Sequence, residues 1–174
     1  MNYRDLQETE FISFFGIHEA EKTENANRLT RVVLKTGGFQ EFIHLELKID
    51  RSNEIKQAVL EIDRSWIGNE LSLNPFAKDI CKSYIDVICR SESNPIINDM
   101  IIGLFEITGK NDNVLYVHPP KPINEHLPET RAAVKVFIGL EPSMDLTLDQ
   151  LKLSMTNMNI ANKDILRVLV DFSS

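Results

Sequence analysis

Two runs of alternating apolar and polar residues between positions 43 and 63 restrict the fold more than any other feature. In the first run every second residue is apolar: Ile43, Leu45, Leu47 and Ile49. The second run repeats the pattern with Ala58, Leu60 and Ile62. A period of two is typical of a strand with one buried face. Because a short polar segment at 51–53 joins the runs, the sequence predicts an antiparallel hairpin.

The clearest helix begins at Asn74 and Pro75. Asparagine is favoured at the N-cap, and proline suits the first helical position, where its missing N–H costs nothing. One apolar stripe follows at helical spacing: Phe76, Ala77, Ile80, Cys81, Tyr84, Ile85, Ile88 and Cys89. Such a helix must cover something apolar, and the buried face of the predicted hairpin is the obvious partner.

Three other segments each fit two structures. Residues 11–17 fit a strand or the end of a short helix, and residues 19–35 fit a helix or a strand that stops at the glycines 37–38. A second Asn-Pro pair at 94–95 predicts another helix. However, residues 101–107 also fit a strand that turns into residues 114–117.

The C-terminal part completes the fold prediction. Residues 132–138 and 165–172 are expected to be strands, and Thr147 with Gln150 fits the capping box of a short helix. Hairpins and helices alternate without regular βαβ units. The fold class predicted is therefore α+β, with a largely antiparallel sheet and two to four helices packed on one face.

The length of 174 residues predicts a single domain over residues 1–174. Four of the seven prolines lie between positions 118 and 128. Proline fixes φ and removes a backbone donor, so this segment should be extended. We expect a proline-rich surface loop at about 118–130 within the domain, because the chain beyond it is short for a second one.

The net charge of −7 disfavours bulk electrostatic binding of nucleic acid and of anionic membranes, and we expect neither as a partner. We expect no secretory signal, because the N-terminal residues lack an apolar stretch. The longest apolar run, at 100–105, is far shorter than a membrane span. Cys81 and Cys89 lie about 12 Å apart on the predicted helix, too far to pair. Two packed thiols predict a cytoplasmic protein.

One strand pattern suggests chemistry. Glu46 and Lys48 lie two residues apart on one strand face, as in metal-dependent nucleases that hold Mg²⁺ and orient a water. Glu61 or Asp63 on the paired strand could supply a further carboxylate. The same pattern is typical of any solvated sheet face, where ion pairs contribute little. We favour the solvated face.

Other candidate sites are weaker. Phosphate-binding loops, thiolate zinc motifs and serine nucleophile elbows are absent from the sequence. His118 and His126 could share a metal with Glu125, but lone loop histidines are more often exposed. Cys89, at the end of its helix, is expected in the core. The prolines of 119–122 satisfy P-x-x-P for an SH3-like partner, although a stiff connector is the simpler interpretation. We expect no metal and no cofactor.

The sequence therefore favours a non-catalytic binding or accessory protein, such as an adaptor, a small chaperone or a regulator. It would act through a sheet face or an exposed edge, by protein–protein contact with a partner or by self-association as a homo-oligomer. One alternative is a metal-dependent hydrolase or nuclease built on the E-x-K strand. Another is a small-molecule-binding domain with a pocket between helix and sheet.

Overall fold

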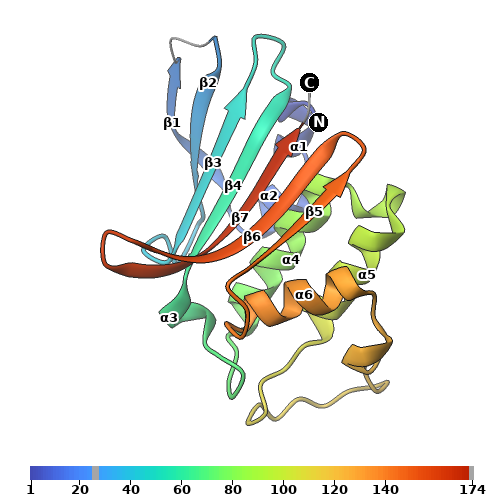
Figure 1. Ribbon diagram of the computed structural model, residues 1–174. Helices are drawn as coiled ribbons and strands as arrows, with labels where there is room; N and C mark the ends of the chain where they lie inside the picture. Colours follow the sequence, from blue (N-terminus) through green and yellow to red (C-terminus); the bar gives the residue numbers. More distant parts are fainter. Residues whose placement is uncertain (25–27, 173–174) are drawn as a thin grey trace.

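The computed structural model describes residues 1–24 and 28–172. In it, seven strands form one sheet in the order β1-β2-β3-β4-β7-β6-β5, and every neighbouring pair is antiparallel (Figure 1). The strands are β1 His18–Glu24, β2 Thr30–Lys35, β3 Ile43–Ile49, β4 Ile55–Asp63, β5 Ser143–Leu148, β6 Leu151–Ile160 and β7 Lys163–Phe172. The predicted α+β class with a largely antiparallel sheet is confirmed.

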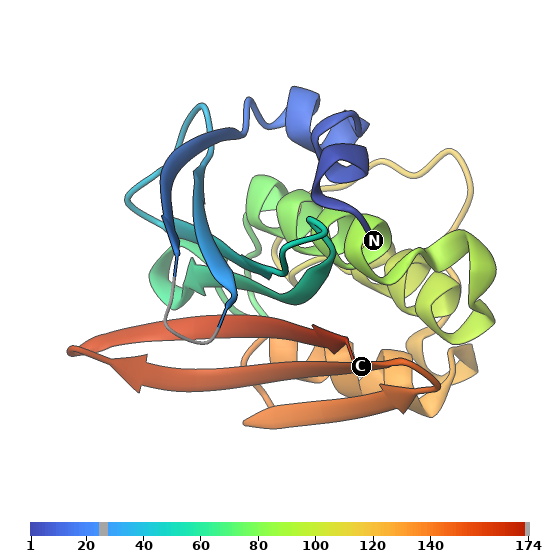
Figure 2. The same cartoon turned by 90° about the horizontal axis from the view of Figure 1, so that it is seen from above.

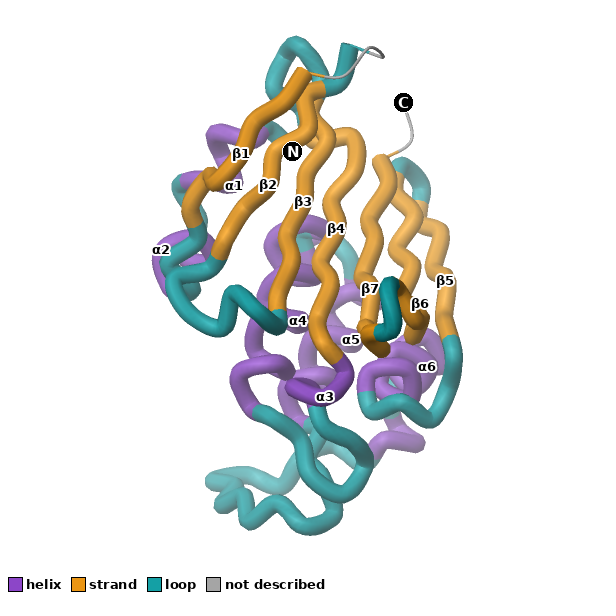
Figure 3. Tube along the Cα trace, turned by 90° about the vertical axis from the view of Figure 1, so that its left-hand side faces the viewer, coloured by secondary structure: helices purple, strands orange, loops and turns teal. Residues whose placement is uncertain are grey.

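The helices gather on one face of this sheet. They are α1 Tyr3–Gln7, α2 Glu10–Phe14, α3 Arg64–Ile67, α4 Pro75–Cys89, α5 Pro95–Glu106 and α6 Pro128–Phe137, with the 3₁₀ turns η1 Ser91–Ser93 and η2 Ile123–Glu125. Seen from above, the sheet is curved, and α4 lies inside the curve (Figure 2). Viewed from the left-hand side of Figure 1, the strands lie in front of the helices, so no helix covers the convex face (Figure 3).

The predicted hairpin is β3 and β4. Leu45 lies opposite Leu60 and Leu47 opposite Ala58, and all four side chains are buried beneath the helices. The turn at 50–54 is held by Asp50, whose carboxylate accepts hydrogen bonds from the backbone N–H groups of Ser52 and Glu54. The period of two therefore located both strands and their inward face.

Helix α4 begins where the sequence predicts, with the Asn74 side chain accepting a hydrogen bond from the Phe76 N–H. It contacts the central strands β4 and β7. Seven of the eight stripe residues are buried, Ile80 and Ile85 among them. Phe76 is the exception, because it lies in the first turn at the edge of the sheet. It is 55% exposed and packs against Phe39 at 5.7 Å between ring centroids.

The structure decides the three ambiguous segments. Residues 11–17 contain the end of helix α2, and residues 94–107 contain helix α5 rather than a strand. The 19–35 segment forms the strands β1 and β2, with residues 25–27 outside the described part. Every residue of β1 is exposed because this strand lies at the sheet edge. It therefore shows no period of two in its apolar residues.

Two predictions for the C-terminal part are wrong. Residues 132–138 belong to helix α6, not to a strand, because Pro128 begins a helix whose buried residues recur at helical spacing: Thr130, Ala133, Val134, Val136 and Phe137. Thr147 and Gln150 do not begin a helix. Leu148 pairs with Leu151, so Asp149 and Gln150 form the two-residue turn between β5 and β6.

The predicted proline-rich loop ends earlier than expected, where α6 begins at Pro128. Cys81 and Cys89 are both free and buried, as predicted. Burial raises the pKa of each thiol to about 12, so neither is a reactive thiolate at neutral pH.

Candidate functional site

The site predicted from the sequence consists of Glu46, Lys48, Glu61 and Asp63. All four lie on the convex face of β3 and β4, but the structure does not gather them into one site. Glu46 accepts hydrogen bonds from Arg31 Nε at 2.9 Å and lies 2.8 Å from Arg31 Nη2. Burial raises the pKa of Glu46, but the hydrogen bond and charge of Arg31 outweigh burial and lower it. Glu46 is therefore held as a carboxylate by a cation of its own protein.

The other three positions are engaged elsewhere. Glu61 accepts a hydrogen bond from Arg167 Nε at 2.8 Å. Asp63 is the N-cap of α3, where its side chain accepts from the Ser65 N–H at 2.8 Å. Lys48 lies across from Gln57. This geometry gives no support to the hydrolase hypothesis, since ligand carboxylates would need free oxygens converging on one ion.

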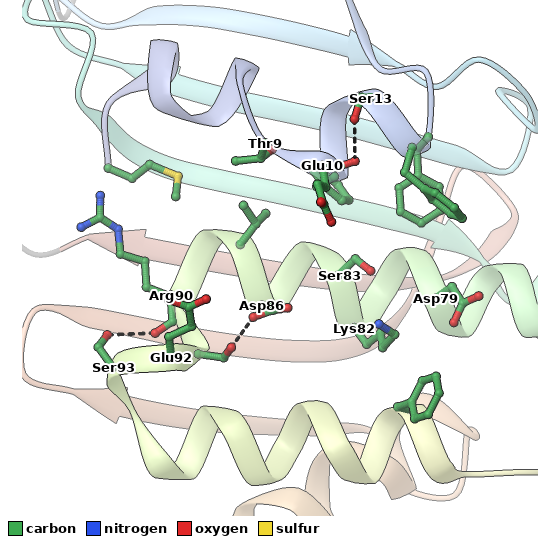
Figure 4. A pocket seen from close by; sticks show the side chains of 17 residues that line it. Thr9, Glu10, Ser13, Asp79, Lys82, Ser83, Asp86, Arg90, Glu92 and Ser93 are labelled. Carbon is green, nitrogen blue, oxygen red and sulfur yellow. Dashed lines mark hydrogen bonds between the residues drawn. The ribbon is translucent and has the colours of Figure 1, made fainter. Parts of the chain in front are cut away.

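A sizeable hollow lies on the helical side instead. A groove of about 1120 Å³ runs between α2 and α4, and η1 and Phe105 of α5 complete its walls (Figure 4). Thr9, Glu10 and Ser13 of α2 form one side. Along α4 the groove follows the face turned away from the sheet: Asp79, Lys82, Ser83, Asp86, Val87 and Arg90. We refer to this surface as the groove.

Two phenylalanines give the groove apolar surface. Phe14 is 76% exposed and Phe105 is 57% exposed. The Phe14 ring packs edge-on against Phe15 at 4.9 Å between ring centroids, and Phe15 packs against the buried Phe11 at 5.5 Å. Phe11 in turn contacts Tyr84 of α4. Phe14 is therefore an exposed ring on a row of packed aromatic side chains, which fixes its position.

Phe105 is held from the opposite wall. Lys82 Nζ lies 5.3 Å from the centre of its ring, and Lys78 Nζ lies 5.9 Å from it. Lys78 also donates to the Ile107 carbonyl oxygen at 2.9 Å, and burial lowers the pKa of its amine. These contacts fix the end of α5 against α4 at one end of the groove.

The charged side chains of the groove are mostly acidic. Four acidic residues line it, against two basic ones. The acidic residues are Glu10, Asp79, Asp86 and Glu92, and the basic ones are Lys82 and Arg90. Of these, Asp86 also accepts a hydrogen bond from the Ser91 hydroxyl, which fixes η1 at the end of α4. A ligand with apolar side chains and a positive charge would match this combination.

A polar cluster outside the groove joins α5 to α6. The Asp99 carboxylate accepts hydrogen bonds from the Thr130 hydroxyl at 2.7 Å, the Leu127 N–H at 2.9 Å and His126 Nδ1 at 3.1 Å. Burial raises the pKa of Asp99, but these hydrogen bonds outweigh it and bring the pKa to about 2. Lys121 Nζ lies 3.5 Å away. Asp99 therefore ties the proline-rich loop and α6 to α5.

The expectation of an exposed His126 is wrong, because its ring is buried between Asp99 and Glu106, with Nε2 3.7 Å from the Glu106 carboxylate. Gly103 makes room for this packing, since a Cβ there would lie 2.4 Å from Thr130 Cγ2. His118 is exposed and does not join it. In the described residues, no three His, Cys, Asp or Glu side chains are placed to hold a metal ion.

The groove was not predicted from the sequence. Phe14 occurs in a run with Phe11 and Phe15, and only the helical spacing of Phe11 and Phe15 hints that Phe14 points elsewhere. Phe105 belongs to an apolar run that reads as core. Both residues become a site only when α2 and α5 lie on either side of α4.

Comparison with protein-family models, with curated proteins and with solved structures finds no match. Within residues 1–24 and 28–172, none of the helices has the length and apolar character needed to cross a bilayer.

Proposed function

We propose that this chain is a non-catalytic binding protein that holds an apolar, positively charged segment of a partner protein in the groove. The observation that carries the proposal is the exposed Phe14 and Phe105 at the two walls of an acidic hollow of about 1120 Å³. Aromatic rings on rigid supports are the residue type that dominates binding energy in protein interfaces. The buried free thiols support action in a reducing compartment such as the cytoplasm.

The helical side is favoured over the sheet for this role. On the convex face, Arg31 and Arg167 neutralise the glutamates of β3 and β4. The edge strand β1 carries Glu19, Glu21, Lys22 and Glu24, and charges of this kind protect a sheet edge from pairing. The groove combines exposed aromatic rings with unbalanced charge.

A segment of polypeptide fits the groove better than a small molecule does. Small-molecule sites usually bury most of the ligand in an enclosed pocket. Here Phe14 and Phe105 both remain largely exposed, so the groove is open to solvent at both of these walls. An elongated ligand can contact both phenylalanine walls at once.

The experiment compares two synthetic amphipathic peptides that differ only in charge, one with leucine and lysine and the other with leucine and glutamate. We expect the lysine peptide to bind about tenfold more tightly in fluorescence anisotropy, because it complements the acidic side chains of the groove. Phe14→Glu should weaken that binding at least about tenfold.

Leu140→Glu serves as the matched control, because Leu140 is also exposed and lies outside the groove. Its binding of the lysine peptide should equal that of the wild-type protein. Equal affinity for both peptides, or a Phe14→Glu protein that binds as well as Leu140→Glu, would contradict the proposal.

A further inference from the structure

The segment that follows α5 presents apolar side chains to solvent. We call residues 113–122 the strap. Leu115 is 101% exposed and Val117 is 93% exposed, whereas Val114 and Tyr116, which alternate with them, are each about half covered. This alternation is that of a strand with one face on the protein and the other face free. Exposed large apolar side chains that gather in one place mark interaction sites.

The backbone of the strap is also unpaired. Over the described residues, the N–H and C=O groups of residues 113–120 make no hydrogen bond within the protein. The strap is held at two points near the end of α5. The Tyr116 hydroxyl donates to the Glu106 carbonyl oxygen at 3.3 Å, and the Lys121 N–H donates to the Glu106 carboxylate at 3.1 Å. The strap is thus positioned by these two contacts, and its chain bends at residues 117–118.

We propose that the strap of one copy of this chain occupies the groove of a second copy, and that the two copies exchange straps reciprocally in a two-fold dimer. The inference rests on the proposed function of the groove and names its occupant. Leu115 and Val117 would lie between Phe14 and Phe105 of the second copy.

Charge and length both support this occupant. Residues 114–121 contain no carboxylate, and their one cationic side chain is Lys121, whose amine lies 3.5 Å from Asp99 of the same copy; acidic side chains outnumber basic ones in the groove. At about 3.3 Å per residue, residues 114–118 span at most about 13 Å, and the bend at 117–118 shortens that span. At about 1.5 Å per residue, α4 extends over about 16 Å between Asp79 and Arg90. The strap is therefore short enough to lie along the floor of the groove.

The position of the strap on its own copy supports a closed dimer. Phe105 lies at one end of the groove, and the next residue, Glu106, anchors Tyr116 of the strap. The groove and the strap are thus neighbours on one surface. A two-fold axis through that surface brings each strap to the groove of the other copy, so the interface is self-complementary and closes at two copies.

The test is sedimentation equilibrium over a range of protein concentrations. We expect the mass to approach twice the 19.9 kDa of one chain as concentration rises. Leu115→Arg and Phe14→Glu should each weaken association at least about tenfold, whereas Leu140→Glu should leave it unchanged. Both test residues are exposed, so the variants should keep the wild-type unfolding midpoint at concentrations low enough for all of them to be monomeric.

Mixing the two defective variants gives the sharpest outcome. Reciprocal exchange places the introduced arginine against the introduced glutamate in one contact and leaves the other contact intact. An equimolar mixture of Leu115→Arg and Phe14→Glu should therefore dimerise more strongly than either variant alone.

A wild-type protein that stays monomeric would overturn the dimer, as would a Phe14→Glu protein that dimerises normally. The latter result would indicate that the two straps pair with each other. Neither result decides the proposed function, which stands or falls with binding of the lysine peptide.

Discussion

Replacing Asp99 with alanine is expected to lower the free energy of unfolding by about 3 kcal/mol, because the hydrogen bonds of His126, Leu127 and Thr130 lose their common acceptor. His126 would remain buried without this partner. The measurement is urea unfolding at pH 7, with Asn98→Ala as control. Asn98 precedes Asp99 on α5 and is exposed, so its replacement should cost less than about 0.5 kcal/mol.

In acid, the free energies of unfolding of Asp99→Ala and the wild-type protein should become more similar. The pKa of Asp99 is lowered from 3.8 to about 2 in the folded protein. A group with a lowered pKa stabilises the fold above its unfolded pKa and loses that contribution as pH falls through the folded value. This contribution is about 2 kcal/mol. The gap between wild type and Asp99→Ala should therefore narrow between about pH 4 and pH 2. A gap that does not change with pH would contradict the assignment.

Replacing Ile85 with alanine is expected to lower the free energy of unfolding by about 3 kcal/mol. Ile85 is fully buried where α4 meets the sheet, so its truncation leaves a cavity. The control is Phe76→Ala on the same helix. Phe76 belongs to the same sequence stripe but is largely exposed, so its loss should cost less than about 1 kcal/mol. Equal costs at the two positions would show that the stripe packs differently from this description.

The elements that follow from the sequence are those whose burial pattern is regular. Between Ile43 and Ile62, apolar residues alternate with polar ones in both β3 and β4. They do so because both strands lie in the middle of the sheet, with one face under the helices. Helix α4 follows from Asn74 and its stripe. The edge strand β1 buries nothing, so its residues carry no such period.

The mistaken elements show local patterns overruled by context. Val134, Lys135 and Val136 alternate like a strand, yet Pro128 begins a helix and α5 provides the surface against which that helix packs. Thr147 and Gln150 have the spacing of a capping box. They lie instead at a hairpin turn, because Leu148 and Leu151 pair across it.

The groove could not be predicted from sequence, for a different reason. Its walls come from residues 9–15, 79–93 and 105, and only the packing of three helices brings them together. The strap gives a partial signal. Four apolar residues at 114–117 precede a proline-rich segment, and the sequence alone does not decide between a paired strand and an exposed one.

The most direct test of the account is a map of backbone amide chemical shifts in the wild-type protein as the leucine–lysine peptide is added, at a protein concentration low enough to keep the chain monomeric. We expect the largest changes on the residues that line the groove, in α2, α4 and η1. Changes concentrated instead around Glu46 and Glu61 on the convex face would contradict it, and would return attention to the sheet.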